Sequence, residues 1–131
     1  MILLDTCTLI WLSADREKLT DKAKQIIRKY TGNLYISSIS ACEIGVKYNK
    51  GLLTLSSPAL SWFQQALEWH GITEIPVDSK IAVQATLLPL IHRDPADRII
   101  IATALEKSLT IVTADKHIHA YGKELDLKVV W

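Results

Sequence analysis

The stretch DPADRIIIATALEKSLTIVTAD, residues 94–115, decides the fold, because it predicts one helix followed directly by one buried strand. Asp94 is a typical N-cap residue, Pro95 suits the first helical position, and the apolar residues up to Lys107 recur at helical spacing. The pattern then changes to a short apolar run, Leu109–Thr113, that is typical of a buried strand. A helix that leads into such a strand indicates an α/β unit with a parallel sheet.

The same alternation continues on both sides of this unit. Short apolar runs predict further strands at Ile2–Leu4, Leu34–Ser37, Thr73–Val77 and Leu127–Val130. Amphipathic segments predict helices at Thr20–Tyr30, Ser38–Asn49, Pro58–His70 and from Asp78 to Pro89, with a short helical turn at Lys116–His119. We therefore expect a three-layer α/β/α sandwich around a mostly parallel five-stranded sheet, built as a single domain of residues 1–131.

Composition is that of an ordinary globular domain, with 49% hydrophobic and 22% charged residues in 131. No apolar run approaches the roughly 18 residues of a membrane span, and the start lacks the basic region of a signal peptide. We therefore expect a cytoplasmic protein with no membrane partner, in which Cys7 and Cys42 are reduced and buried. The net charge of +1 excludes nucleic-acid binding by a bulk excess of positive charge, so such binding needs a local site.

Acidic side chains are concentrated near the carboxyl ends of the predicted strands, where open parallel sheets bind their ligands. Asp5, Asp78 and Asp115 follow strands, Glu43 lies in the helix after the second strand, and Asp94 and Asp97 begin the helix that leads into the fourth. Carboxylates that converge raise one another's pKa, and a divalent cation such as Mg²⁺ or Mn²⁺ removes that conflict. Such an ion can activate water and stabilise the transition state of a phosphodiester.

Most of these acids also have a purely structural explanation. Four of them are placed to cap a helix or to complement its dipole: Asp78, Asp94, Asp97 and Asp115. Glu43 can pair with Lys47 one helical turn later. Asp5 is the hardest to explain in this way, because it ends a buried strand where an uncompensated charge is costly. The functional interpretation rests on their joint placement.

Four segments resemble, in order and at the right intervals, the PIN domain, and more closely the VapC-type toxins of bacterial toxin–antitoxin pairs. They are ILLDTCTLIW (2–11), SSISACEIGVKYNKGLLTL (37–55), LPLIHRDPADRIIIATAL (88–105) and LTIVTADKHIHAY (109–121), and the final VVW is similar to the family's ending too. The sequence departs from the pattern at Ala96, where relatives often carry Phe, and at Cys7, where another residue is usual. Both departures leave the family's acidic positions intact.

The resemblance implies a metal-dependent endoribonuclease that acts as the toxin of a pair, with RNA and a cognate antitoxin protein as partners. It implies a quartet that holds Mg²⁺ or Mn²⁺, with three supporting residues: Asp5, Glu43, Asp97 and Asp115, supported by Thr6, Asp94 and Thr113. Basic side chains around this centre are candidates for RNA contacts: Lys47, Lys50, His92, Arg93, Arg98, Lys116 and His117. Ordinary solvated surface charge is the alternative for each, and Arg98 can also pair with Asp94 one turn earlier.

The predicted helix Pro58–His70 is apolar nearly all round. One stripe consists of Leu60, Phe63 and Leu67, and a neighbouring one of Ala59, Trp62, Ala66 and Trp69. Two stripes exceed what a single core contact needs, so we expect part of this helix to meet a second copy in a homodimer or an antitoxin helix. A large aromatic corner of the core is the alternative.

Two other functions fit parts of the sequence. A phosphomonoesterase or phosphotransferase would use Asp5 as its nucleophile, although Cys7 stands where such enzymes often carry a second Asp. A non-catalytic binding module would use the acids only as helix caps. Such a module has no affinity for divalent ions beyond the weak background of an acidic surface.

Overall fold

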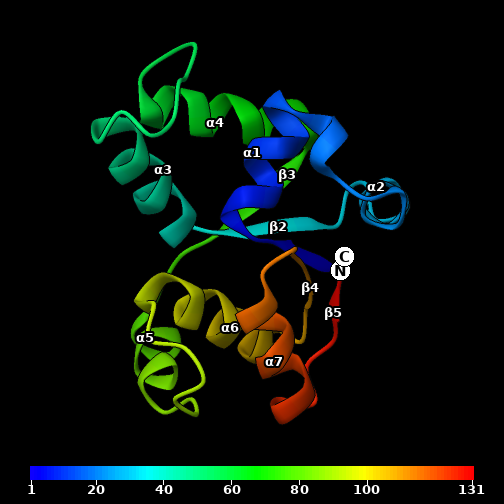
Figure 1. Ribbon diagram of the computed structural model, residues 1–131, viewed down its shortest axis with the longest axis vertical. Helices are drawn as coiled ribbons and strands as arrows, with labels where there is room; N and C mark the ends of the chain where they lie inside the picture. Colours follow the sequence, from blue (N-terminus) through cyan, green and yellow to red (C-terminus); the bar gives the residue numbers. More distant parts are fainter.

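A parallel sheet of five strands forms the middle layer, in the order β3-β2-β1-β4-β5 (Figure 1). The computed structural model describes every residue from Met1 to Trp131. Its strands are β1 (Ile2–Leu4), β2 (Leu34–Ser37), β3 (Ile72–Ile75), β4 (Thr110–Val112) and β5 (Val129–Val130). All neighbouring strands are parallel, and Leu4 at the end of β1 is aligned with Ile36 on one side and Val112 on the other. The central strands therefore end at one common edge.

Helices cover both faces of this sheet. They are α1 (Thr6–Ala14), a 3₁₀ turn η1 (Arg16–Lys18), α2 (Asp21–Lys29), α3 (Ile39–Asn49), α4 (Ala59–His70), α5 (Ser79–Thr86), α6 (Pro95–Lys107) and α7 (Lys116–Leu125). Helices α1 to α4 lie on one face and α5 to α7 on the other (Figure 1). Ile2 and Leu4 pack into the first layer and Leu3 into the second, because successive side chains of a strand point to opposite faces. The predicted three-layer sandwich is confirmed.

The predicted helix boundaries are confirmed where they depend on capping chemistry. The Asp78 carboxylate accepts a hydrogen bond from the backbone N–H of Ile81 at 2.9 Å and begins α5. Asp94 does the same for Ala96 at 2.9 Å and begins α6. At the end of α4, Gly71 adopts a left-handed φ of +64°, a conformation that glycine reaches without strain.

Other boundaries differ from the expectation. Helix α1 lies where the sequence predicts no element. Its own side chains are apolar or small all round the helix, so they leave no amphipathic pattern. Helix α7 runs to Leu125, well beyond the predicted turn at Lys116–His119. Gly122 weakens the helical pattern there, yet glycine is needed, because a Cβ at this position would lie 2.8 Å from a methyl group of Val129. Strand β3 begins at Ile72 instead of Thr73 and ends at Ile75, and β5 is reduced to two residues.

The apolar faces of α4 divide between the core and the surface. Phe63 and Ala66 are buried, and Trp62 and Leu67 pack against the core beside them. Trp69 is instead 85% exposed and Leu60 65% exposed. The aromatic-corner alternative therefore accounts for only part of the helix.

Two further observations concern the cysteines and the membrane. Neither cysteine forms a disulfide bond, and Cys7 is half-buried. The expectation that both thiols are buried is wrong for Cys42, because it faces solvent from α3. Among the helices, none combines the length and the apolar character that crossing a membrane requires.

Candidate metal centre

Five acidic side chains gather at the edge where β1 and β4 end. Asp5 follows β1, Asp115 follows β4 by a short turn, Glu43 comes from α3, and Asp94 and Asp97 begin α6. The negative charges of the other four act on Asp97, so the expected convergence is present in the structure. Asp78 does not take part, and its role is to cap α5.

Asp5 is the most deeply buried of these acids, with 7% of its surface exposed. One carboxylate oxygen accepts a hydrogen bond from the backbone N–H of Thr8 at 2.8 Å, which makes Asp5 the N-cap of α1. The other oxygen accepts from the hydroxyl of Thr113. Burial raises the pKa of Asp5 above its ordinary value, and these hydrogen bonds oppose the rise. The two threonines therefore hold the carboxylate in one orientation.

Glu43 is half-buried and is held by a second hydroxyl. The Thr6 hydroxyl donates to Glu43 Oε1, and the same hydroxyl oxygen lies 2.9 Å from Ser40 Oγ. Burial raises the pKa of Glu43. The alternative of an ion pair with Lys47 is not realised, because the Lys47 ammonium lies 3.8 Å from Cys7 Sγ and makes no ion pair. Glu43 therefore faces the other acids without a cationic partner at contact distance.

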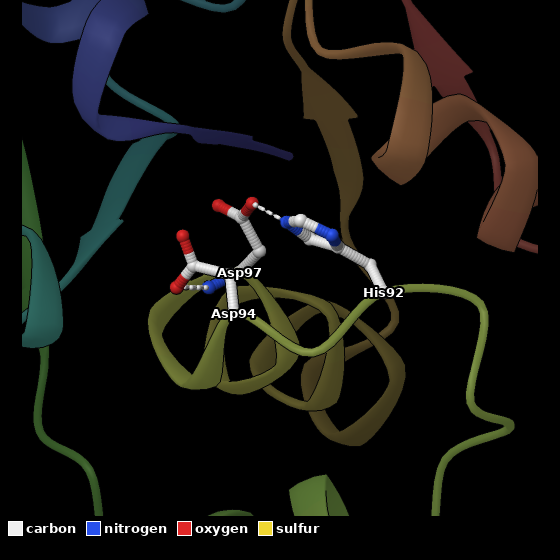
Figure 2. Close-up of side chains that lie close together, drawn as sticks. All are labelled: His92, Asp94 and Asp97. Carbon is white, nitrogen blue, oxygen red and sulfur yellow. Dashed lines mark hydrogen bonds and ion pairs between the residues drawn. The ribbon is translucent and has the colours of Figure 1, made fainter.

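Asp94 and Asp97 lie at the start of α6 together with His92 from the loop before it (Figure 2). His92 Nε2 is 3.2 Å from Asp97 Oδ2. The possible ligand atoms of these three side chains all lie within 4.8 Å of one another, and no other trio of such side chains in the structure is as close. Burial, with added repulsion from Asp94 and Asp115, raises the pKa of Asp97 to about 7.

Asp115 completes the group and is linked to Asp5 through Thr113. Its carboxylate accepts hydrogen bonds from the backbone N–H groups of His117 at 2.8 Å and Ile118 at 3.1 Å, so it is the N-cap of α7. Its own backbone N–H donates to Thr113 Oγ1 at 3.0 Å. Thr113 thus ties the ends of two neighbouring strands together.

Three helix N-termini consequently point at this centre, and each is capped by one of its acids. The expected structural roles of Asp94 and Asp115 are confirmed, and Asp5 has the same role on the unforeseen helix α1. The partial positive charge of a helix N-terminus, roughly half an elementary charge, offsets part of the negative charge. Capping and ion binding are therefore compatible roles of the same side chains.

No lysine or arginine forms an ion pair with these acids, although the positive charge of Lys47 acts on Glu43 from beyond contact distance. The ion pairs of the structure join Lys18 to Asp15, Lys80 to Glu106 and His92 to Asp97, so none brings a lysine or arginine to the centre. The donors are carboxylate oxygens with hydroxyl groups behind them, which are the ligands that Mg²⁺ and Mn²⁺ prefer. The residues present therefore fit a divalent cation.

The basic candidates occupy different environments. Lys50, Arg93, Lys116 and His117 are exposed, and Lys47 and His92 are half-buried. Arg98 is 8% exposed, and its guanidinium donates to the carbonyl oxygens of Leu88 at 2.9 Å and Pro89 at 3.0 Å. The expectation that Arg98 contacts RNA is therefore wrong, as is its alternative pairing with Asp94. The guanidinium is committed to the carbonyl oxygens of a folded loop.

The sequence does not reveal the contacts that two residues near the centre, His92 and Tyr121, make. The sequence predicts His92 only as a candidate RNA contact, and its place two residues before Asp94 is the available signal that it lies beside the acids. Tyr121 ends the family-like segment LTIVTADKHIHAY, but no local pattern indicates that its hydroxyl accepts from the backbone N–H of His92, 29 residues earlier. Only the folded loop brings them together.

Comparison with known proteins identifies similar chains. The family model of the PIN domain matches residues 2–124. Ribonuclease VapC22 of Mycobacterium tuberculosis is 32% identical over 121 residues, which are 92% of this chain and 91% of that protein.

Solved structures share the fold. VapBC2 from Rickettsia felis, bound to a DNA fragment from its promoter, has a TM-score of 0.71 at 20% identity and covers 100% of this chain and 99% of that chain. A toxin–antitoxin complex from Klebsiella pneumoniae has a TM-score of 0.60 at 23% identity, covering 88% and 87%. At these identities the likeness extends to the fold alone.

Proposed function

The chain belongs to the PIN domain family, and from this premise we propose that it is a divalent-metal-dependent endoribonuclease, the toxin of a toxin–antitoxin pair. The similar ribonuclease from Mycobacterium tuberculosis supports the reaction, and the toxin–antitoxin complexes of the same fold support the biological setting. Both proposed partners, RNA and an antitoxin, fit action in the cytoplasm.

The observation that carries the proposal is a cluster of acids that forms no ion pair with a lysine or arginine. Converging carboxylates cost free energy, because burial and mutual repulsion both disfavour their charged forms. A protein that only needed helix caps would have no use for Glu43, which lies in the second turn of α3 and caps nothing. The cost is explained if the acids bind a cation.

A divalent ion bound here would activate water and neutralise charge that develops on a phosphodiester. The chain's own part is to hold the ligands. Thr113 and the N–H of Thr8 orient Asp5, the hydroxyl of Thr6 orients Glu43, and the caps of α6 and α7 place Asp97 and Asp115. We assign the exposed Arg93 and Lys116 to the RNA backbone, because they follow or precede two of these acids in the chain.

The alternative phosphotransferase mechanism fits this geometry less well. A nucleophilic Asp5 would need a free carboxylate oxygen and room for a phosphate beside it. Both Asp5 oxygens instead accept hydrogen bonds, and only 7% of the residue is exposed. Asp5 is better suited to hold an ion than to attack a substrate.

We further propose that an antitoxin segment binds the groove between α1, α2 and α4. Leu12, Arg16 and Trp69 line two adjoining hollows of this groove, and Trp69 is 85% exposed. Lys24 and Arg28 of α2 add positive charge beside the apolar surface. This combination favours an amphipathic partner helix with an acidic face. A second copy, as in the expected homodimer, is the other candidate for the same surface.

The test is cleavage of end-labelled total RNA by the purified, partner-free chain. With Mg²⁺ or Mn²⁺ we expect discrete cuts that disappear with EDTA and fall at least a hundredfold in Asp97→Asn, since a ligand of the essential ion is lost. Asp126→Asn is the matched control, because Asp126 is exposed at the opposite end of α7. Equal cutting by Asp97→Asn and the control contradicts the proposal.

A further inference from the structure

The loop before α6 places an imidazole beside two of the carboxylates (Figure 2). His92 Nε2 faces Asp97 at 3.2 Å, and the ligand atoms of His92, Asp94 and Asp97 lie within 4.8 Å of one another. The ring of His117 packs against the His92 ring, with centroids 4.1 Å apart, and restricts its orientation. An imidazole nitrogen therefore lies among oxygen donors at a spacing that one ion can span.

Two buried side chains hold the backbone of His92 in place, and we call them the latch: Arg98 and Tyr121. The backbone N–H of His92 donates to Tyr121 Oη at 3.0 Å. Its carbonyl oxygen accepts from Arg98 Nη1 at 3.3 Å and lies 3.1 Å from Tyr121 Oη. Burying a guanidinium is costly unless its donors are satisfied, so this latch fixes the loop firmly. The position of His92 is thus set before any ligand arrives.

The two aspartates keep oxygen atoms available. Asp94 uses Oδ1 for the N–H groups of Ala96 at 2.9 Å and Asp97 at 3.4 Å, and no hydrogen bond engages its Oδ2. Asp97 contacts His92 through Oδ2, and its Oδ1 has no hydrogen-bond partner. The three side chains can therefore each direct one atom at a common ion.

We propose that His92 ligates the divalent ion through Nε2 together with Asp94 and Asp97, and thereby favours Mn²⁺ over Mg²⁺. Mg²⁺ takes oxygen ligands and rarely nitrogen, whereas imidazole suits transition-metal ions, which bind nitrogen more readily. The inference rests on the proposed function only in taking this ion to be the one the nuclease uses. Binding of the ion can therefore be measured without RNA, separately from the cleavage activity.

The experiment adds Mn²⁺ to the metal-free chain, without RNA, and records the electron spin-echo modulation of the bound ion. Coupling to a ligand nitrogen is expected in the wild type and in His70→Gln, a histidine at the far end of α4. The coupling is expected to vanish in His92→Leu, with a fall in Mn²⁺ affinity of about tenfold or more by calorimetry and a smaller change for Mg²⁺. Circular dichroism verifies that the variants fold.

Tyr121→Phe separates ligation from positioning. It removes one hydroxyl of the latch and leaves the imidazole, so nitrogen coupling persists while Mn²⁺ affinity falls by about tenfold. Absence of nitrogen coupling in the wild type, or its persistence in His92→Leu, overturns the inference. If the chain cuts RNA but shows no nitrogen coupling, the proposed nuclease function is supported and ligation by His92 is contradicted. If it shows nitrogen coupling but cuts no RNA, ligation by His92 is supported and the nuclease function is contradicted.

Discussion

At the scale of single residues, Asp97 carries an electrostatic conflict that makes its contribution to stability depend on pH. Its pKa is about 7 in the folded chain and 3.8 without the fold. Between these values the folded state holds a proton that the unfolded state has released. The free energy of unfolding of the ion-free protein therefore falls as pH rises through this window, and the loss is complete above about pH 7.

Removing the charge should stabilise the ion-free protein at high pH. We expect Asp97→Asn to raise the free energy of unfolding at pH 8 by about 1–2 kcal/mol, less than the full shift because water screens the half-buried group, or roughly 3–8 °C in Tm. Thermal unfolding in EDTA at pH 8 and pH 4 measures the effect, which should vanish at the lower pH. If Asp97→Asn is no more stable than the wild type at pH 8, the charged Asp97 carboxylate does not destabilise the ion-free protein, and this explanation is contradicted. Adding Mn²⁺ should stabilise the wild type alone.

The sequence was sufficient to find the acids of the centre but not every basic partner. Strand ends and helix starts place Asp5, Glu43, Asp97 and Asp115 at one edge together with Asp78 and Asp94, and the resemblance to the PIN domain selects the four. The structure brings the charges of the four together. Arg98 could not be placed, because a buried guanidinium has the same local pattern as an exposed one. Its partners are carbonyl oxygens of a loop whose path depends on Tyr121, far away in the sequence.

At the scale of elements, substitutions of the N-cap residues can distinguish a role in helix stability from a role in catalysis. Asn caps a helix about as well as Asp, so Asp115→Asn should keep α7 intact, changing the free energy of unfolding by less than about 0.5 kcal/mol, while RNA cutting is lost. Asp78→Ala should do the opposite. It removes the cap of α5, which costs about 1 kcal/mol, and leaves cutting unchanged. Urea unfolding and RNA cleavage of both variants test this pair of predictions. Loss of cutting in Asp78→Ala would contradict the assignment of the metal centre, which leaves Asp78 outside it.

The elements were predictable in kind more than in extent. Every strand was foreseen, since parallel strands buried on both faces leave short apolar runs in the sequence. Helix α1 was not, because burial on nearly all sides erases the periodicity that marks a helix. Gly122 obscured α7 for a different reason, which is its close approach to β5. Both misses come from tertiary packing, which local patterns do not encode.

At the scale of the whole molecule, both helical layers contribute acids to the metal centre, whereas the layer that contains α4 also presents an uncovered apolar surface. Trp69 on α4 is the largest exposed side chain of that surface, and truncating such an anchor at an interface commonly costs 2 kcal/mol or more. We expect Trp69→Ser to weaken antitoxin binding by about thirtyfold or more in calorimetry, with RNA cutting by the free chain unchanged. Leu87→Ser, 77% exposed after α5 on the opposite layer, is the matched control. If a second copy covers α4 instead, sedimentation will show a dimer that Trp69→Ser dissociates.

The chemical ends of the RNA fragments test the central claim most directly, that the acids hold an ion which directs water at the phosphodiester. Attack by water leaves one phosphate and one hydroxyl end and does not involve the ribose 2′-hydroxyl. We predict 5′-phosphate and 3′-hydroxyl ends, formed only with Mg²⁺ or Mn²⁺, and continued cutting when the scissile nucleotide carries a 2′-deoxyribose. Ends with a 2′,3′-cyclic phosphate, or cutting that persists in EDTA, would contradict the account, because the 2′-hydroxyl would then be the nucleophile or the ion would be dispensable.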